Sequence, residues 1–249
     1  SQSLSKVLIS GDGGDELFGG YTFRYEKFLS LTSESSSPKE KILAYLQCHE
    51  RDSVPDQQNI FNNKLNFSWD LIHNHLLPYF DNKLSRLEQV FLADYNGKLL
   101  YNFNPVNINI IKNFNMELLT PILNDELLEN GPHLIQSEKY NPKNNVGKLP
   151  FRAILKKNKH DHLVGNKKLG FNVNTINLWK NYGKNLCKEL LTDSRIVKEG
   201  WINNDWIKKY IDSPELDVKY VNKFFGLLAF EVWYRLFITK EMNSNTNLN

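Results

Sequence analysis

The feature that most constrains the fold is a short apolar run that leads directly into a segment rich in glycine and acidic residues. Residues 6–10 read Lys-Val-Leu-Ile-Ser, and residues 11–20 read Gly-Asp-Gly-Gly-Asp-Glu-Leu-Phe-Gly-Gly. An aliphatic run bounded by a turn signal predicts a buried β-strand. A strand that feeds a glycine-rich turn and then a helix is typical of a parallel α/β sheet.

The glycine-rich turn is the strongest candidate for a binding site. Gly11, Gly13 and Gly14 allow a ligand to approach the backbone closely and allow unusual backbone angles. Successive backbone N–H groups in such a turn can form an anion-binding nest, and the helix that follows adds its positive end. A generic Gly-Asp-Gly loop is more often a solvated turn, but this order of residues after an apolar strand favours a phosphate site.

Acidic side chains accompany these glycines. Asp12, Asp15 and Glu16 place carboxylates beside the predicted nest. Carboxylates next to a phosphate site indicate Mg²⁺, which prefers hard oxygen ligands and bridges protein to phosphate. The segment is neither a G-x-G-x-x-G fingerprint nor a P-loop, because no Gly-Lys-Ser/Thr follows it. The sequence therefore predicts a nucleotide site of another kind.

Beyond the turn, the apolar periodicity predicts helices almost throughout. We expect about eight helices and one convincing strand. The clearest predicted helices are residues 39–50, 84–92, 125–129, 149–157, 203–212 and 217–242. Because a single strand cannot satisfy its own backbone groups, we expect residues 6–10 to pair with strands outside this chain. The polar tail, residues 243–249, is expected to be disordered.

Composition excludes several classes of protein. Hydrophobic residues make up 41% and charged residues 24% of the chain, with a net charge of +3, values that suit a soluble globular protein. Acids and bases are interspersed, so neither nucleic acid nor a membrane is an expected partner. Cys48 and Cys187 are too few for a disulfide framework, which favours the cytoplasm. The sequence shows no signal-peptide pattern. It also lacks an initiating Met, so we expect residues to be missing upstream.

Several segments resemble one enzyme family. Residues 7–21, Val-Leu-Ile-Ser-Gly-Asp-Gly-Gly-Asp-Glu-Leu-Phe-Gly-Gly-Tyr, resemble the second signature of the synthetase domain of glutamine-dependent asparagine synthetases. That family belongs to the ATP pyrophosphatases. Further segments agree in order and approximate spacing: Glu-Leu-Leu-Thr-Pro-Ile-Leu-Asn at 117–124, Lys-Leu-Pro-Phe-Arg at 148–152, Lys-Lys-Leu-Gly-Phe at 167–171 with Trp179 downstream, and the closing helix at 230–237.

The resemblance implies an α/β fold of the adenine nucleotide alpha hydrolase type. Residues 1–242 would be its mostly helical C-terminal portion, with one or a few strands of the parallel sheet. The family's Ser-Gly-Gly-x-Asp-Ser pyrophosphate loop and its N-terminal glutaminase domain are absent from this sequence. We therefore expect a fragment of a longer protein that is inactive alone. The resemblance also allows a homodimer.

The resemblance further implies a reaction and its site. ATP would adenylate the side-chain carboxylate of aspartate, and ammonia from a glutaminase domain outside this chain would displace AMP to give asparagine. Ser10 and Gly11 match positions that contact the nucleotide, and Gly13 and Gly14 belong to the same nucleotide-binding turn. Asp12 occupies the place of an acid, often Glu, tied to the acyl-adenylate and the incoming ammonia.

Three more residues receive roles from the resemblance. Asp15 matches a ligand of Mg²⁺-pyrophosphate. Lys148 matches a lysine that neutralises charge as pyrophosphate leaves, a task that suits a flexible ammonium. Arg152 lies one helical turn further along and is expected to share the face of Lys148.

The chain also departs from the family's pattern. Asn-Ile-Asn at 107–109 replaces Val-Asp-Arg, and Leu119 replaces an arginine, so charges expected near the substrate are missing. Two alternatives therefore stay open. One is a related amidotransferase with another acceptor, such as a sugar, a peptide or a β-amino acid, because fold does not fix substrate. The other is a non-catalytic subunit of the same fold.

Overall fold

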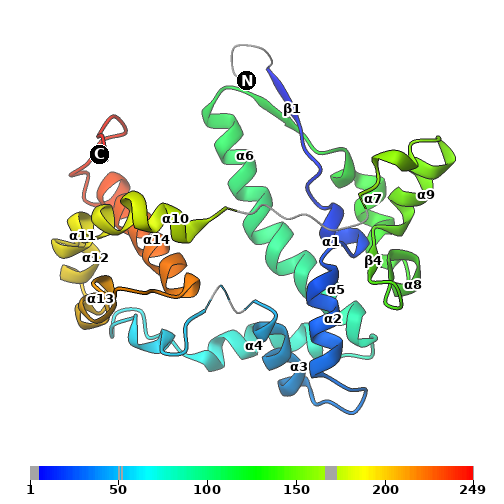
Figure 1. The fold of residues 1–249 in the computed structure, drawn as a ribbon, viewed down its shortest axis with the longest axis horizontal. Helices are drawn as coiled ribbons and strands as arrows, with labels where there is room; N and C mark the ends of the chain where they lie inside the picture. The colour runs from blue at the N-terminus through cyan, green and yellow to red at the C-terminus, as the bar shows by residue number, and fades with distance from the viewer. Residues whose placement is uncertain (1–5, 50, 52, 166–172, 249) are drawn as a thin grey trace. The chain divides into compact units, whose positions relative to one another are not determined.

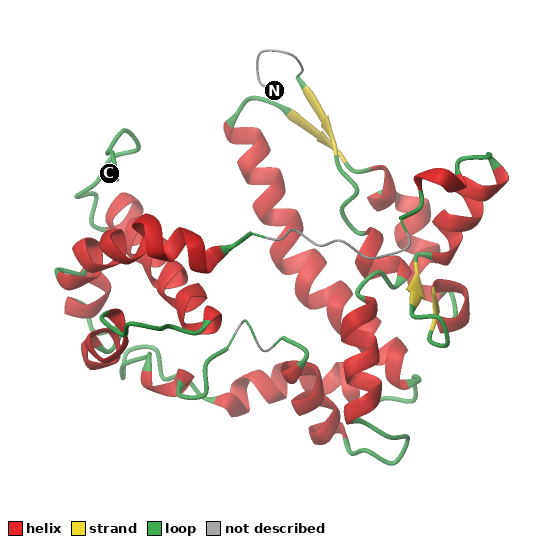
Figure 2. Cartoon of the chain, viewed as in Figure 1, coloured by secondary structure: helices red, strands yellow, loops and turns green. Residues whose placement is uncertain are grey.

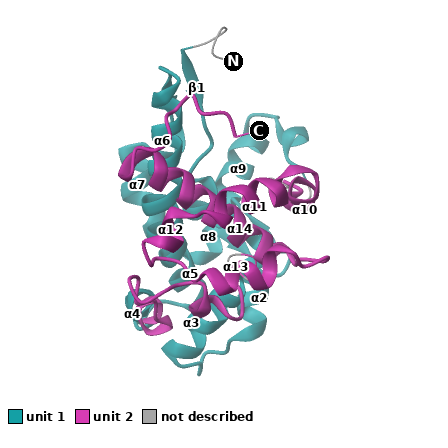
Figure 3. Ribbon diagram, turned by 90° about the vertical axis from the view of Figure 1, so that its left-hand side faces the viewer, with its two compact units in different colours: residues 1–48, 74–170 teal, residues 49–73, 171–249 magenta. Residues whose placement is uncertain are grey.

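The computed structural model of the chain describes residues 6–49, 51, 53–165 and 173–248. The chain divides into two compact units (Figure 3). Unit 1 comprises residues 1–48 and 74–170, and unit 2 comprises residues 49–73 and 171–249. Helices dominate both units, as Figures 1 and 2 show. Within the described ranges, no helix combines the length and apolarity that crossing a bilayer requires.

Unit 1 holds the glycine-rich turn and most of the helices. Its α-helices are α1 (Gly14–Phe18), α2 (Thr22–Leu31), α3 (Pro38–Gln47), α5 (Arg86–Asp94), α6 (Asn104–Asn113), α7 (Asp125–Asn130), α8 (Gln136–Lys139) and α9 (Leu149–Lys157). A π-helix, Tyr95–Phe103, joins α5 to α6, so that the three form one long rod (Figure 1). Helix α4 (Trp69–Phe80) contains residues of both units.

The predicted strand forms, but its surroundings differ from the prediction. Strand β1 (Val7–Ile9) pairs in parallel with β2 (Glu117–Leu119), so the expectation of partners only outside the chain is wrong. The expectation of burial is also wrong, because Val7 is 39% and Ile9 70% exposed. The two strands make a sheet of their own, which leaves the side chains of β1 uncovered. The parallel pairing nevertheless confirms a small parallel sheet.

Capping residues explain why several predicted helices begin where they do. Ser37 forms a capping box with Glu40 at the start of α3. The Asn124 side chain accepts a hydrogen bond from the N–H of Leu127 and caps α7, which contains the helix predicted at 125–129. Helix α9 spans Leu149–Lys157, the predicted range. Local side-chain hydrogen bonds therefore fix the starts of α3 and α7, whereas α9 begins with Pro150 in its first turn.

The core of unit 1 is rich in aromatic side chains. Tyr25 of α2 is fully buried and makes edge-on contacts with Phe91 of α5 and Tyr140, at centroid distances of 5.1 and 5.3 Å. Leu87 and Val90 of α5, within the predicted helix at 84–92, are also buried. This packing joins α2 and α5 to the short hairpin of β3 (Tyr140–Asn141) and β4 (Val146–Gly147).

Unit 2 is built around the last long helix. Its α-helices are α10 (Thr175–Leu178), α11 (Lys184–Thr192), α12 (Arg195–Lys198), α13 (Asn204–Ile211) and α14 (Val218–Trp233). A π-helix, Tyr234–Ile238, extends α14, so the predicted helix ends earlier than residue 242. Phe224 is fully buried and packs on Trp206 at 5.3 Å. Phe224, Phe225 and Phe230 therefore belong to this core, whereas Trp233 and Phe237 are exposed.

A buried carboxylate ties α14 to α12. Glu231 is 0% exposed. It accepts hydrogen bonds from the hydroxyl of Ser194 at 2.7 Å and the N–H groups of Arg195 and Ile196 at 2.8 and 3.0 Å, and it pairs with Arg235. Burial raises the pKa of Glu231, but these hydrogen bonds outweigh that effect and lower the pKa overall. The carboxylate therefore accepts hydrogen bonds from the first backbone N–H groups of the four-residue helix α12, which have no partner within that helix.

Candidate functional site

The glycine-rich turn begins at the carboxyl end of β1, the edge of a parallel sheet where ligands bind. Ser10 extends the pairing by donating its N–H to the carbonyl of Leu119 at 2.9 Å, and its hydroxyl accepts from the N–H of Asp12 at 3.2 Å. Gly13 has φ +87°, and a Cβ there would lie 2.2 Å from a methyl carbon of Leu123. The left-handed conformation therefore favours glycine at this position, and a side chain there would also displace the methyl group of Leu123.

Lys148 and Asp15 meet beside this turn. Lys148 Nζ lies 3.2 Å from Asp15 Oδ1. The backbone of Lys148 is left-handed, with φ +56°, and its N–H donates to the carbonyl of Phe18 at 2.8 Å. Such a conformation costs about 1–3 kcal/mol in a residue other than glycine and clusters at functional sites. The structure thus brings together two predicted site residues from distant segments.

Two close approaches of backbone make this meeting possible. The hairpin of β3 and β4 lies so near α1 that a Cβ on Gly147 would stand 1.8 Å from the carbonyl oxygen of Gly19. A Cβ on Gly20 would stand 1.8 Å from Asp15 Oδ1 and 2.6 Å from Lys148 Cε. Glycine at both positions therefore lets the hairpin bring Lys148 against the turn.

Two backbone N–H groups of the turn already donate hydrogen bonds within the turn. The N–H of Gly14 lies 3.3 Å from the carbonyl oxygen of Gly11, and the N–H of Asp12 is bonded to Ser10. A phosphate would compete for these two donors. Helix α1 is five residues long. Lys148 Nζ would lie 3.5 Å from a Cβ on Gly14, so this ammonium places positive charge beside the turn.

Asp12 contacts Asn107, a position where the chain departs from the pattern of the family it resembles. The side-chain amide of Asn107, on α6, donates to Asp12 Oδ2 at 2.8 Å. Sequence reasoning missed this contact because nothing in the local pattern places α6 against the turn. The one available signal was position 107 itself, where the family's pattern is broken.

Glu16 does not join the other two carboxylates. It is 3% exposed, and the hydroxyl of Tyr21 donates to it. Burial raises the pKa of Glu16, and the hydrogen bond from Tyr21 offsets part of that rise. The prediction of acids beside the turn therefore holds for Asp12 and Asp15, which are partly exposed, and fails for Glu16.

Arg152 contacts backbone on both sides of the Lys148 peptide. Its side-chain Nε donates to the carbonyl of Gly147 at 2.9 Å. Its backbone N–H lies 3.1 Å from the carbonyl oxygen of Lys148. The guanidinium thereby holds the strand end that precedes the lysine. The predicted Lys-Lys-Leu-Gly-Phe segment at 167–171 lies outside the described residues.

Comparison with known proteins places these features in a family. The family model described as asparagine synthase matches residues 1–235. The chain belongs to the asparagine synthase family. This family consists of ATP-dependent amidotransferase ligases that use ATP and Mg²⁺, and its fold is of the adenine nucleotide alpha hydrolase type. No curated protein and no solved structure matches the chain.

The residues at the turn of this asparagine synthase domain fit Mg²⁺ bound to phosphate. Among the described residues, no cluster of three or more His, Cys, Asp or Glu side chains is suited to a metal ion. Mg²⁺ needs no such cage, because it binds through one or two carboxylates together with phosphate oxygens and water. The Asp15 side chain is 22% exposed and the Lys148 side chain 34%, so both are accessible beside the turn. A carboxylate oxygen is the type of ligand that Mg²⁺ takes, and an ammonium is a type of group that pairs with phosphate.

Proposed function

We propose that the protein forms an amide bond at the expense of ATP, by adenylating the side-chain carboxylate of aspartate and transferring ammonia to it. The carboxylate oxygen attacks the α-phosphorus of ATP and releases pyrophosphate. Ammonia then attacks the acyl carbon, AMP leaves, and asparagine remains after loss of a proton. The ammonia would come from glutamine in a domain outside this chain. The contact between Asp15 and Lys148 at the end of β1, in a chain of this family, carries the proposal.

Asp15 and Lys148 would act on the departing pyrophosphate. When bound, Mg²⁺ supplies charge neutralisation at the phosphates, and Asp15 would hold it. Lys148 would follow the negative charge that develops as the bond to the α-phosphorus breaks. The strained backbone of Lys148 supports this role, because the surrounding structure holds the lysine at this place at an energetic cost.

The turn itself would bind the nucleotide. Ser10 and Gly11 would contact it at the end of β1, and the missing side chains of Gly13 and Gly14 would let the phosphates approach the backbone. Asp12 would assist the attack of ammonia by accepting a proton, provided that its carboxylate is presented to the substrate. The amide of Asn107 orients that carboxylate.

Arg152 would act mainly by positioning Lys148. Its hydrogen bond to the Gly147 carbonyl braces the end of β4, immediately before the lysine. A guanidinium suits this task because its planar fork is less flexible than an ammonium. We expect its loss to weaken catalysis through the placement of Lys148.

One observation favours a second candidate, an amidotransferase of the same family with a different acceptor. Residues 107–109, Asn-Ile-Asn, stand where the family commonly has Val-Asp-Arg, so an Asp-Arg pair is missing. Asn107 donates a hydrogen bond to Asp12. Leu119 replaces an arginine at the end of β2 and is 43% exposed. The loss of these charges fits an acceptor that differs from aspartate.

An ATP–pyrophosphate exchange assay on the full-length protein separates these candidates. Each candidate acid is added in turn: aspartate, a β-amino acid, a sugar acid and a short peptide. Exchange that depends on aspartate supports asparagine formation. Exchange with another acid and none with aspartate supports the second candidate. No exchange with any acid indicates a non-catalytic subunit and contradicts both.

A further inference from the structure

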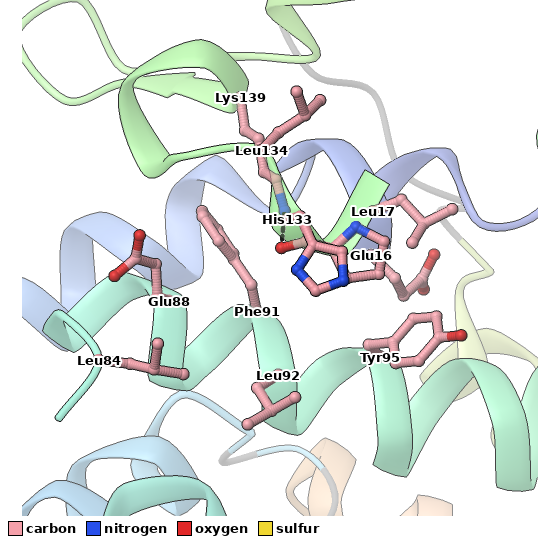
Figure 4. Close-up of a pocket in the computed structure, with 11 residues that line it drawn as sticks. Glu16, Leu17, Leu84, Glu88, Phe91, Leu92, Tyr95, His133, Leu134 and Lys139 are labelled. Carbon is pink, nitrogen blue, oxygen red and sulfur yellow. Dashed lines mark hydrogen bonds between the residues drawn. The ribbon is translucent and has the colours of Figure 1, made fainter. Parts of the chain in front are cut away.

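A separate pocket of about 200 Å³ lies in unit 1, next to the helix that carries Asp15. Leu17 of α1, Phe91 and Leu92 of α5, and Leu134 supply much of its apolar lining (Figure 4). Lys139 also lines it. None of the residues to which the proposed reaction gives a role lines this pocket.

Lys139 places a buried cation in the pocket wall. The residue is 3% exposed, and its Nζ lies 3.3 Å from the carbonyl oxygen of Pro132 and 5.5 Å from the ring centre of Phe91. An ammonium has three N–H donors, and Pro132 accepts one of them. Burial lowers the pKa of Lys139 to about 8, with the nearby Glu88 opposing that shift. A cation in such surroundings favours an anionic partner.

The acids in the same wall are already engaged. Glu88 belongs to the capping box at the start of α5, where it accepts from the N–H of Ser85 at 2.9 Å. Glu16 accepts from the hydroxyl of Tyr21. Both carboxylates thus accept hydrogen bonds within the protein, whereas Pro132 accepts from Lys139, whose ammonium has further N–H donors to offer a ligand.

We propose that this pocket binds a small carboxylate with an aromatic or branched aliphatic body, whose carboxylate pairs with Lys139 and whose body packs on Phe91, Leu92 and Leu134. The volume agrees with this class, because an apolar cavity of about 150 Å³ accommodates benzene. Charge-assisted pairing with a buried ammonium gives such a ligand its preference over a neutral analogue. A molecule bound there would touch Leu17, on the same helix as Asp15.

Benzoate and its neutral analogue benzamide test the proposal directly. Binding to the full chain is followed by calorimetry and by NMR shifts of the methyl groups of Leu17, Leu92 and Leu134. Benzoate should bind at least about tenfold more tightly than benzamide. Lys139→Met should remove this preference while keeping the fold. Lys143→Met, which changes an exposed lysine outside the pocket, should keep it.

Several results would overturn the proposal: no binding of benzoate, equal binding of both compounds, or an unchanged preference in Lys139→Met. If Lys139→Met does not fold, Leu134→Trp is tested in its place. Its larger side chain fills the pocket while Lys139 remains. Loss of benzoate binding in that variant supports the proposal, and retained binding contradicts it. None of these measurements depends on ATP chemistry, so they stand apart from the proposed function.

Discussion

Lys148 Nζ lies 3.2 Å from Asp15 Oδ1, and this contact joins the start of α9 to the helix that follows the glycine-rich turn. Both side chains are partly exposed, so the ion pair contributes about 1 kcal/mol or less to stability. The left-handed backbone of Lys148 costs more than that. The ion pair alone therefore does not offset the cost of this backbone conformation, which is consistent with the phosphate-binding role that we propose for Lys148.

Removing the ammonium of Lys148 should separate function from stability. Lys148→Met in the full-length protein should lower ATP–pyrophosphate exchange by about 10²–10³-fold, because a cation that stabilises the leaving pyrophosphate is lost. The melting temperature should change little. Lys159→Met is a matched control, since Lys159 is also left-handed, with φ +61°, and is exposed. If both variants catalysed exchange at the same rate, Lys148 would have no role at the site.

Gly20→Ala should disturb the same contact without removing either partner. The new Cβ would lie 1.8 Å from Asp15 Oδ1, so the carboxylate must turn away from Lys148. Because the displaced atom ends a flexible side chain, we expect a loss of stability of only about 1 kcal/mol but a clear loss of exchange activity. Gly147→Ala instead places its Cβ against the backbone of Gly19 and should lower the melting temperature more. The opposite order would contradict the packing described for the hairpin.

Asp94 should make stability depend on pH. It is fully buried on α5, the hydroxyl of Tyr45 donates to it at 2.8 Å, and burial raises its pKa to about 7. The folded state therefore keeps a proton that the unfolded state has lost above about pH 4. As a result, the free energy of unfolding should fall as pH rises from about 4 to 7, by at most about 1.4 kcal/mol per unit.

The variant Asp94→Asn checks this slope. It cannot lose the proton, so denaturant unfolding across that pH range should show a smaller decline than in the wild type. Asp81→Asn, at an exposed position, should retain the wild-type slope. A slope in Asp94→Asn identical to that of the wild type would show that Asp94 is not protonated in the folded protein.

Glu231 should be essential to unit 2. Glu231→Gln removes the charge that pairs with Arg235 and accepts from the start of α12, and should cost about 3 kcal/mol of stability. Hydrogen exchange should speed up first at the amides of Arg195 and Ile196. Glu189→Gln, an exposed change on α11, is the control and should leave exchange there unchanged. Unaltered protection in Glu231→Gln would contradict the capping role.

Local signals made parts of the fold predictable. The predicted range 149–157 matches α9, which has Pro150 in its first turn, and the predicted helix at 125–129 matches α7, which Asn124 caps. Strand β2 was missed because Glu117–Leu119 is short and contains no β-branched residue. Helix α6 was missed because its asparagines and β-branched residues have low helix propensity. It forms as a continuation of the rod that begins with α5.

The candidate site shows the same division. The glycines and acids of the turn are contiguous, so the sequence alone indicated a phosphate site. The approach of Lys148 to Asp15 and of Asn107 to Asp12 depends on non-local packing, which spacing cannot reveal. A resemblance to the family indicated the two residues of the first contact, whereas the second was signalled only by the departure from the family's pattern at position 107. The burial of Glu16 likewise follows from its partner Tyr21 and not from its neighbours in the turn.

The most direct test is a crystal structure of the full-length protein with Mg²⁺ and ATP. The account predicts the phosphates at the turn after β1, with the metal on Asp15 and Lys148 Nζ within hydrogen-bond reach of a phosphate oxygen. Nucleotide bound elsewhere, with the turn empty and the contact between Lys148 and Asp15 unchanged, would contradict it.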